Sequence, residues 1–223
     1  MGGRIYDEAP VFCFTSDVDW ASDDVWKSLH RLFVGYGIKP TYFITHGSGF
    51  LEGLKREGGA GLGIHPNFAP GSSQGETLEE IIDYCLSLVP GARAARSHQY
   101  YDENAVSYML YEKGIRFDSS VCTRVEPGIK PLTLNSGIVR IPVFWEDGSY
   151  SEYASDWKLN TLKPRIETCG IKTFDLHPMN VVLNVPDRPF YHRLKEDFPG
   201  EKWSELTRDQ IETLRFRGRG PLT

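Results

Sequence analysis

Short apolar runs alternate along this chain with stretches of helical periodicity, and this alternation restricts the fold more than any other feature. Runs at 11–14, 41–45 and 61–64 have the length and composition of buried strands. Between the first two, residues 25–33 repeat apolar side chains at the spacing of one helix face. Strands separated by helices favour a mostly parallel sheet with crossover helices, so we expect an α/β fold.

The same alternation continues toward the C-terminus. Further helices are expected over 51–56, 77–89, 103–113 and 206–216, and further strands over 92–96, 115–118, 139–142 and 172–176. The stretch 125–156 is rich in proline, glycine and aromatic residues, so we expect much of it to form loops over the site. No repeat, low-complexity tract or linker divides the chain, and we expect a single domain over residues 1–223.

Composition limits the partners and the compartment. The net charge of −5 gives no electrostatic reason to expect a nucleic acid or an anionic membrane as partner. No run has the length of a membrane span, and the N-terminus lacks the apolar stretch of a signal peptide. The four cysteines lie far apart and form no CxxC pair, which argues against a structural zinc knuckle. We therefore expect a cytoplasmic protein with reduced thiols.

Most of the expected strands end on a polar or titratable side chain. Carboxyl ends of parallel strands meet at one mouth, where such folds bind ligands. We therefore expect seven side chains to gather there: Asp17, Asp19, His65, Arg96, His98, Asp118 and His177. Carboxylates and imidazoles bind zinc and similar divalent metals. In an extended segment Asp17 and Asp19 point to the same side, so one can bind metal while the other stays free as a base.

Each of these residues also has an ordinary structural explanation when it is taken alone. Asp17 and Asp19 can cap the helix that follows them. A histidine before proline, as at His65, can mark a strand-to-loop turn, and isolated charges such as Arg96 or Asp118 are commonly solvated or paired locally. The joint placement favours a site, because otherwise every strand end needs a separate explanation.

Five segments resemble, in order, the motifs of the polysaccharide deacetylase family, also called the NodB-homology domain or carbohydrate esterase family 4. The segments lie at 14–19, 61–66, 95–98, 118–120 and 174–178, so the resemblance extends over most of the chain. The forms "His-Pro-Asn-Phe" and "Arg-Ser-His" resemble a subgroup associated with bacterial surface-polysaccharide or lipopolysaccharide biosynthesis. The resemblance implies a distorted (β/α) barrel of about seven strands.

The resemblance also implies roles for the site residues. It makes Asp17 the general base and Arg96 the residue that orients it, while Asp19 and His65 bind the metal. It makes His177 the general acid, and we expect a nearby carboxylate to keep that imidazole protonated. Asp118 and Asp175 are the two candidates for this carboxylate. Trp145, Tyr100, Tyr101 and Phe144 could offer faces for a sugar ring, although core packing also accounts for such residues.

One position departs from the family pattern. The family has a second metal-binding histidine four residues after the first, and this chain has Ala69 there. We expect His98 to supply the third protein ligand because it follows a neighbouring strand end; Asn67 and His46 are the alternatives.

The function implied is metal-dependent hydrolysis, with zinc as the first candidate. Its substrate would be an N-acetyl or O-acetyl group on a sugar, a nucleotide-sugar or a lipid-linked glycan. Two alternatives stay open at this point. One is an amidohydrolase acting on a C–N bond outside sugars, and the other is an inactive carbohydrate-binding protein that keeps the barrel.

Overall fold

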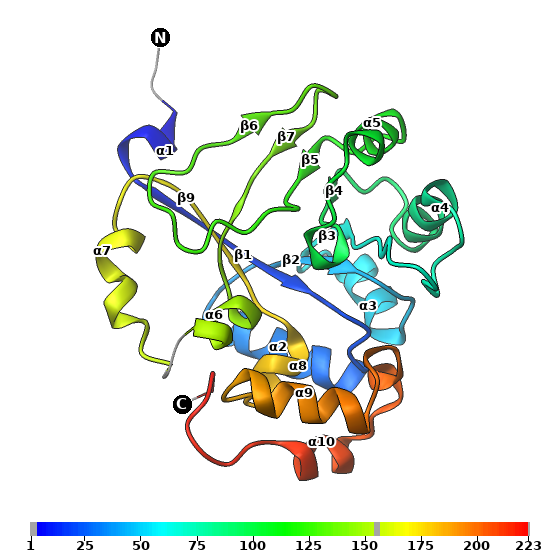
Figure 1. The fold of residues 1–223 in the computed structure, drawn as a ribbon, viewed down its shortest axis with the longest axis vertical. Helices are drawn as coiled ribbons and strands as arrows, with labels where there is room; N and C mark the ends of the chain where they lie inside the picture. The colour runs from blue at the N-terminus through cyan, green and yellow to red at the C-terminus, as the bar shows by residue number, and fades with distance from the viewer. Residues whose placement is uncertain (1–3, 154–156, 223) are drawn as a thin grey trace.

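The computed structural model describes residues 4–153 and 157–222. Its strands form one nine-stranded sheet with the order β6-β7-β5-β4-β3-β2-β1-β9-β8 (Figure 1). Their bounds are β1 Pro10–Asp17, β2 Thr41–Ile44, β3 Gly61–Ile64, β4 Ala94–Ala95, β5 Phe117–Asp118, β6 Leu132–Thr133, β7 Val139–Arg140, β8 Val143–Glu146 and β9 Gly170–Asp175.

Helices lie between and around these strands. The larger ones are α2 Asp23–Gly35, α3 Gly49–Glu57, α4 Leu78–Leu88, α5 Asn104–Glu112, α6 Asp147–Tyr153, α9 Arg188–Asp197 and α10 Arg208–Leu214. The shorter ones are α1 Ile5–Glu8, η1 His98–Tyr100, η2 Leu159–Leu162, α7 Lys163–Ile166, α8 Pro178–Val182 and η3 Gly200–Glu205. None of these described helices is both long and apolar enough to cross a lipid bilayer.

The sheet is parallel except at one edge. β1 lies between β2 and β9 and pairs with both in parallel, and the parallel pairing continues through β3, β4, β5 and β7. Only β6 runs antiparallel to its neighbour β7. The expected parallel sheet with crossover helices is therefore confirmed, and it has nine strands where we expected about seven.

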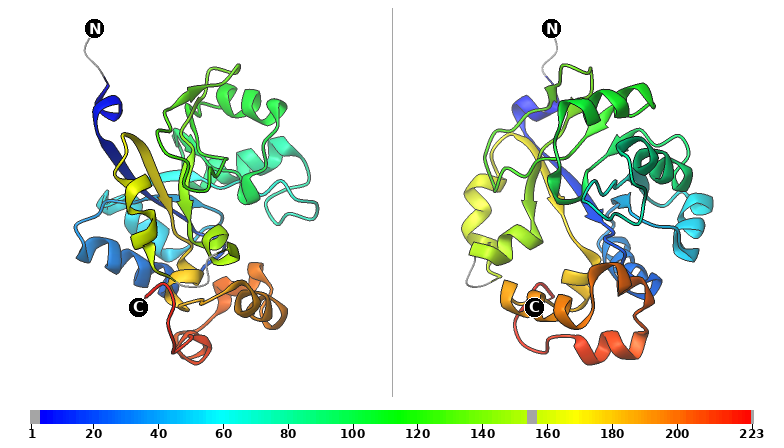
Figure 2. Two further views of the ribbon diagram at one scale, coloured as in Figure 1. Left: turned by 60° about the vertical axis from the view of Figure 1, so that its left-hand side comes forward. Right: turned by 45° about the vertical axis from the view of Figure 1, so that its right-hand side comes forward.

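The sheet curls until the chain that follows β5 reaches β8 (Figure 2). The Val143 amide donates to the Val121 carbonyl at 2.8 Å, and the Thr123 amide donates to the Val143 carbonyl at 2.9 Å. One residue pair further along, the Val125 amide donates to the Phe144 carbonyl at 2.7 Å. These bonds bring the two sides of the sheet together and make a distorted barrel, from which β6 and β7 extend beside β5.

The stretch 125–156 contains more regular structure than its composition suggests. Its described residues include β6, β7, β8 and helix α6, whereas we expected loops apart from a strand at 139–142. β8 pairs in parallel with β9, and Val143, Phe144 and Trp145 on it are buried. Their burial outweighs the turn-forming residues around them, because a parallel strand that is covered on both faces can consist of a short apolar run.

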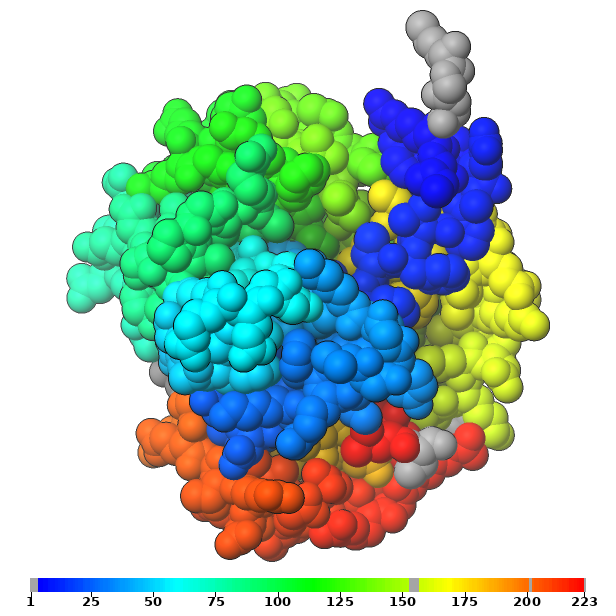
Figure 3. All heavy atoms as spheres, turned by 180° about the vertical axis from the view of Figure 1, so that it is seen from behind, coloured from blue at the N-terminus to red at the C-terminus, as the bar shows by residue number. Residues whose placement is uncertain are grey.

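Helix α2 shows how the outer layer is held to the sheet. Its residues Val25, Trp26, Leu29 and Phe33 are buried on one face, as the spacing predicts. The Trp26 ring packs edge-on against Tyr42 of β2, with ring centroids 5.2 Å apart. Helix α10 of the C-terminal segment contacts this helix, and Figure 3 shows orange and red atoms lying beside the blue ones.

Alanine substitutions at Leu29 and Leu32 test this packing within one helix. Leu29 is 2% exposed and Leu32 is 39% exposed. Leu29→Ala should lower the free energy of unfolding by about 2–5 kcal/mol because it leaves a cavity, whereas Leu32→Ala should change it by only about 0.5 kcal/mol. Urea denaturation of both variants checks this, and equal losses would contradict the orientation of α2.

Candidate metal and catalytic site

The ends of β1, β3, β4 and β9 place the expected side chains around one mouth. β1 ends at Asp17, and Asp19 follows in a left-handed turn with φ of 45°. The next residue, Trp20, has φ of 56°, and its amide donates to the Thr45 hydroxyl at 3.0 Å. Asp17 and Asp19 thus face the same cavity because the chain turns, and not because an extended strand alternates as we expected.

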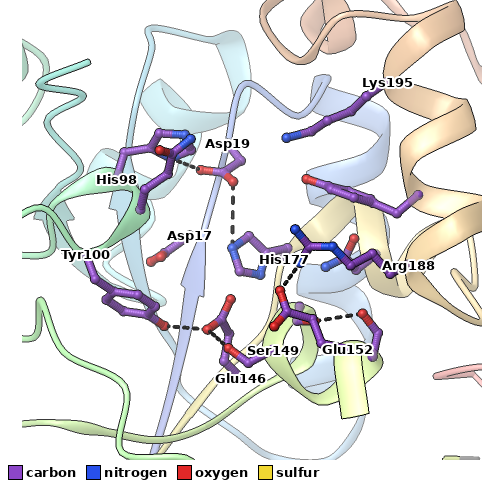
Figure 4. Close-up of a pocket in the computed structure, with 15 residues that line it drawn as sticks. Asp17, Asp19, His98, Tyr100, Glu146, Ser149, Glu152, His177, Arg188 and Lys195 are labelled. Carbon is purple, nitrogen blue, oxygen red and sulfur yellow. Dashed lines mark hydrogen bonds and ion pairs between the residues drawn. The ribbon is translucent and has the colours of Figure 1, made fainter. Parts of the chain in front are cut away.

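Asp19, His65 and His98 form a compact group of possible metal ligands. One ligand atom of each lies within 4.8 Å of the others. An Asp19 carboxylate oxygen is 3.2 Å from Nε2 of His65 and 3.2 Å from Nδ1 of His98. The two imidazole nitrogens are 3.4 Å apart. Figure 4 shows Asp19 and His98 facing each other across the upper part of the cavity.

The hydrogen bonds of His65 prepare it to bind a metal. Its Nδ1 is 2.6 Å from the Arg96 carbonyl oxygen, which can only accept, so Nδ1 carries the proton. The Nε2 lone pair of the neutral ring then faces Asp19 and His98. Burial lowers the pKa of His65, but the Asp17 and Asp19 carboxylates outweigh it and raise that pKa above 6.5. One carboxylate and two imidazoles fit zinc or a similar divalent ion.

Three residues were candidates for the third metal ligand, and among the described residues the structure groups His98 with Asp19 and His65. Asn67 is engaged elsewhere, because its side-chain oxygen accepts from the Ala69 amide at 3.2 Å. His46 Nδ1 lies 2.9 Å from the Thr45 hydroxyl, and His46 is not part of the ligand group among the described residues. The Asn67 side chain thus holds the turn in which Ala69 replaces a second histidine. His98, which follows the next strand end, lies beside Asp19 and His65 instead.

Arg96 joins two buried carboxylates, those of Asp17 and Asp175, under the mouth. Its side chain is fully buried, and one guanidinium nitrogen donates to Asp17 at 2.8 Å and also to Asp175. The other terminal nitrogen donates to the hydroxyls of Thr15 and Ser119, each at 3.0 Å. Asp17, Asp175 and His177 form a second group of possible metal ligands, and the positive charge of Arg96 on both carboxylates opposes the binding of a cation there.

Burial and the neighbouring charges act on the pKa of Asp17 in opposite directions. Burial raises its pKa, the Arg96 guanidinium lowers it, and the Asp175 carboxylate raises it again, so that the pKa is about 6. His65 Nε2 is 3.7 Å from the second carboxylate oxygen of Asp17. A carboxylate with this pKa, held by one hydrogen-bond donor and facing a cavity, can accept a proton near neutral pH.

His177 has a buried carboxylate partner that the sequence did not reveal. Its Nδ1 lies 2.7 Å from Asp147, and its backbone amide donates to the same carboxylate at 2.8 Å. Burial lowers the pKa of His177, but Asp147, Asp19 and Asp175 raise it well above 6.5. Nε2 faces the cavity, 3.6 Å from Asp19. The carboxylate that raises the pKa of His177 most is thus that of Asp147, a residue that we did not name.

Asp118 does not reach His177, so our expectation that it could be the partner carboxylate is wrong. Asp118 forms an ion pair with Arg140, and its other oxygen accepts from the Ser120 amide at 3.2 Å. Arg140 also binds Asp102 at 2.6 Å. The other candidate, Asp175, is 4.0 Å from His177 Nδ1 and is held by Arg96 instead. Asp147 begins α6 directly after β8, in the stretch where we expected loops.

A cavity of about 450 Å³ opens in front of these residues. The Tyr100 and Ser149 hydroxyls line it and donate to Glu146, at 2.9 Å and 2.6 Å (Figure 4). Of the four aromatic residues considered for sugar binding, Tyr100 alone lines this cavity. Phe144 and Trp145 are core residues in a small cluster, and Tyr101 packs against Phe68 outside the cavity.

Comparisons with known proteins agree on a family. Residues 14–195 match the family described as WbmS-like polysaccharide deacetylase. A crystal structure from Bordetella bronchiseptica, of a candidate polysaccharide deacetylase involved in O-antigen biosynthesis (WbmS), is similar with a TM-score of 0.79 and 28% identity, over 94% of this chain and 85% of that chain. One from Mycobacterium smegmatis, of a candidate polysaccharide deacetylase, has a TM-score of 0.52 and 14% identity over 93% and 84%, so it shares the fold alone. No curated protein matches the chain in sequence.

Removal of His98 tests the ligand group. His98→Ala should weaken zinc binding by about 100-fold or more, because it removes one of three protein ligands. His46→Ala is the matched control, since it removes an imidazole outside the group, and it should change the affinity by less than about twofold. Isothermal titration calorimetry on the zinc-free protein checks both. Equal losses, or none at His98, would contradict this ligand set.

Zinc affinity should also fall as the pH is lowered. A protonated imidazole cannot bind metal, and the flanking carboxylates keep the pKa of His65 above 6.5. Affinity should therefore be greatest above that pKa and fall as the pH drops through it. Titrations at pH 8, 7 and 6 should show zinc affinity falling by up to about tenfold per pH unit for each proton that zinc must displace. An affinity that stays constant or rises toward pH 6 would refute this.

Proposed function

This chain belongs to the WbmS-like polysaccharide deacetylase family, and from that membership and the geometry of its site we propose that it hydrolyses the N-acetyl group of a sugar with the help of a divalent metal. The family resemblance read from the five motifs is confirmed by this match, and it makes the chain a carbohydrate deacetylase. We place the reaction in the biosynthesis of a bacterial surface polysaccharide, because the similar Bordetella protein is described as involved in O-antigen biosynthesis.

The observation that carries the proposal is the order of residues around the cavity. Asp19, His65 and His98 form a metal-ligand group, Asp17 stands beside it, and His177 faces Asp19 with Nε2 at 3.6 Å. When bound there, a divalent ion such as zinc supplies Lewis-acid chemistry, which acidifies water and polarises an acyl oxygen. Hydrolysis of an amide needs those effects together with one proton acceptor and one proton donor.

Asp17 is the proton acceptor in this proposal. Its carboxylate faces the cavity, and Arg96 fixes its orientation through one hydrogen bond of 2.8 Å. The charge of Arg96 lowers the pKa of Asp17 against the effect of burial, so the base is ionised at neutral pH. Asp17 takes the proton of the attacking water, whose oxygen forms the new bond to the acyl carbon.

His177 is the proton donor. Asp147 holds its Nδ1 and its backbone amide, which leaves the Nε2 proton directed into the cavity. The C–N bond breaks as Nε2 gives this proton to the departing amine, and acetate and the amino sugar are the products. A pKa well above 6.5 keeps the ring protonated before the step.

Two alternative functions remain distinguishable by experiment. The same residues could hydrolyse a C–N bond outside sugars, and release of acetate from acetylated sugars separates the two activities. An inactive carbohydrate-binding protein is the second alternative. The position of His98 beside Asp19 and His65 supports an active enzyme, since it supplies the third ligand that Ala69 does not.

Paired substitutions separate metal binding from catalysis. Asp17→Asn should lower the rate of acetate release by about 10²–10⁴-fold and leave bound zinc unchanged, because it removes only the proton acceptor. His65→Ala should lose both zinc and activity. Elemental analysis and an acetate assay on the same preparations check this. Full activity in Asp17→Asn would refute the assignment of the base.

Asp147→Asn tests the partner of His177. An amide at this position keeps the volume but no longer stabilises the imidazolium, so kcat should fall by about 10- to 100-fold. The basic side of the pH–rate profile should move to lower pH, because the pKa of His177 falls with its carboxylate. Asp118→Asn is the matched control and should leave that profile in place. A shift in both variants, or in neither, would contradict the pairing.

A further inference from the structure

Helix α9 turns a basic and aromatic face toward the cavity. Arg188, Tyr191 and Lys195 are spaced at i, i+3 and i+7, so they fall on one side of the helix. All three line the cavity, and Figure 4 shows Arg188 and Lys195 on α9 reaching in from the side opposite Tyr100. None of the steps described for the hydrolysis uses this face.

Lys195 lies close to the metal-ligand group without a carboxylate of its own. Its ammonium is 4.7 Å from the centre of the Tyr191 ring and 5.7 Å from that of Trp203. No carboxylate pairs with it within residues 4–153 and 157–222. A second hollow of about 150 Å³ shares Asp19, His98 and Lys195 with the main cavity, so this lysine lies between two open spaces beside the ligand group.

The Asp19 carboxylate attracts Lys195 without forming an ion pair with it in the part of the chain that the structure describes. Asp19 has three histidine neighbours already, and Arg188, at the other end of the face, pairs with Glu152 and donates to His192 at 3.0 Å. The opposite cavity wall carries the carboxylate of Glu146, which would repel an anion. Of the two lysine and arginine side chains that line this cavity among the described residues, Lys195 is therefore the one whose charge is left for an anionic group of a ligand.

We propose that Lys195 binds an anionic group carried by the acetylated sugar, so that the natural substrate is an acidic N-acetyl sugar. The inference rests on the proposed deacetylase function and names its substrate class. The anion is a carboxylate on the sugar ring or a phosphate attached to it, since both accept hydrogen bonds from an ammonium. Lys195 is a specificity residue in this role, and the acetyl group lies at the ligand group formed by Asp19, His65 and His98.

Three sugars that share one acetamido group test the substrate class. They are N-acetylglucosamine, its C6 uronic acid and its 1-phosphate, assayed with the zinc-loaded enzyme. The wild type should prefer at least one acidic sugar by about tenfold in kcat/KM, mostly through KM. Lys195→Gln should lose this preference while kcat/KM for the neutral sugar stays within about twofold. The acidic sugar that is preferred identifies the anion.

Two further variants serve as controls for Lys195→Gln. Lys195→Arg should keep most of the preference, and Lys39→Gln, an equal charge change at an exposed position outside the cavity, should keep all of it. Circular dichroism confirms folding of each variant. No preference in the wild type, or an equal loss for neutral and acidic sugars in Lys195→Gln, would overturn the proposal.

Calorimetric binding of the same three sugars separates this inference from the proposed function. If no sugar is deacetylated but the acidic ones still bind about tenfold more tightly through Lys195, the deacetylase function fails and the anion site stands. If acetate is released from all three sugars at equal kcat/KM with equal affinity, the function stands and the anion site fails.

Discussion

The buried guanidinium of Arg96 is the interaction on which the arrangement of the site depends. It leaves the end of β4 and contacts residues of β1, β9 and the segment after β5, while its plane lies over the Phe43 ring of β2 at 4.3 Å. Burial lowers the pKa of Arg96, but Asp17 and Asp175 more than restore it, so the group stays charged. A buried charge left without its partner destabilises a protein by about 3–5 kcal/mol, so these strand ends hold one another in place.

This arrangement explains why one carboxylate of the Asp17-Val18-Asp19 segment differs from the other. Asp17 ends the strand, is tied to Arg96 from below and has a pKa of about 6. Asp19 lies past the turn among the histidines; burial raises its pKa, but His98 and His65 lower it well below its usual range. The first carboxylate suits proton transfer and the second suits binding of a cation, and a single residue, Val18, separates them in the chain.

Part of this site could be predicted from the sequence because it follows strand ends. His65 and Arg96 come directly after an apolar run and Asp17 and His98 within three residues of one, and parallel strands bring such positions together whatever the loops do. Asp147 also follows a strand end, that of β8, and the apolar run 143–145 was the sequence feature that could have revealed it. The prolines, glycines and aromatics around that run concealed the strand, so the position was assigned to Asp118 or Asp175 instead.

The rest of the site depends on features that a local pattern does not contain. The left-handed turn at Asp19 is set by the contact of Trp20 with Thr45, far away in the sequence. Helix α9 has a proline in its first turn and a buried Leu194 as its main core contact, which gives weak apolar periodicity. Its cavity-lining face at Arg188, Tyr191 and Lys195 could therefore be recognised only once the helix was placed beside β1 and α6.

Anomalous X-ray scattering from crystals grown with zinc tests the central claim most directly, because it locates the metal without reference to activity. The account predicts one strong peak at the zinc edge, bounded by the Asp19 carboxylate, Nε2 of His65 and Nδ1 of His98, with Asp17 and Arg96 still paired beside it. Zinc ligated by Asp17 with the Asp17–Arg96 pair broken, or zinc bound only away from this mouth, would contradict it.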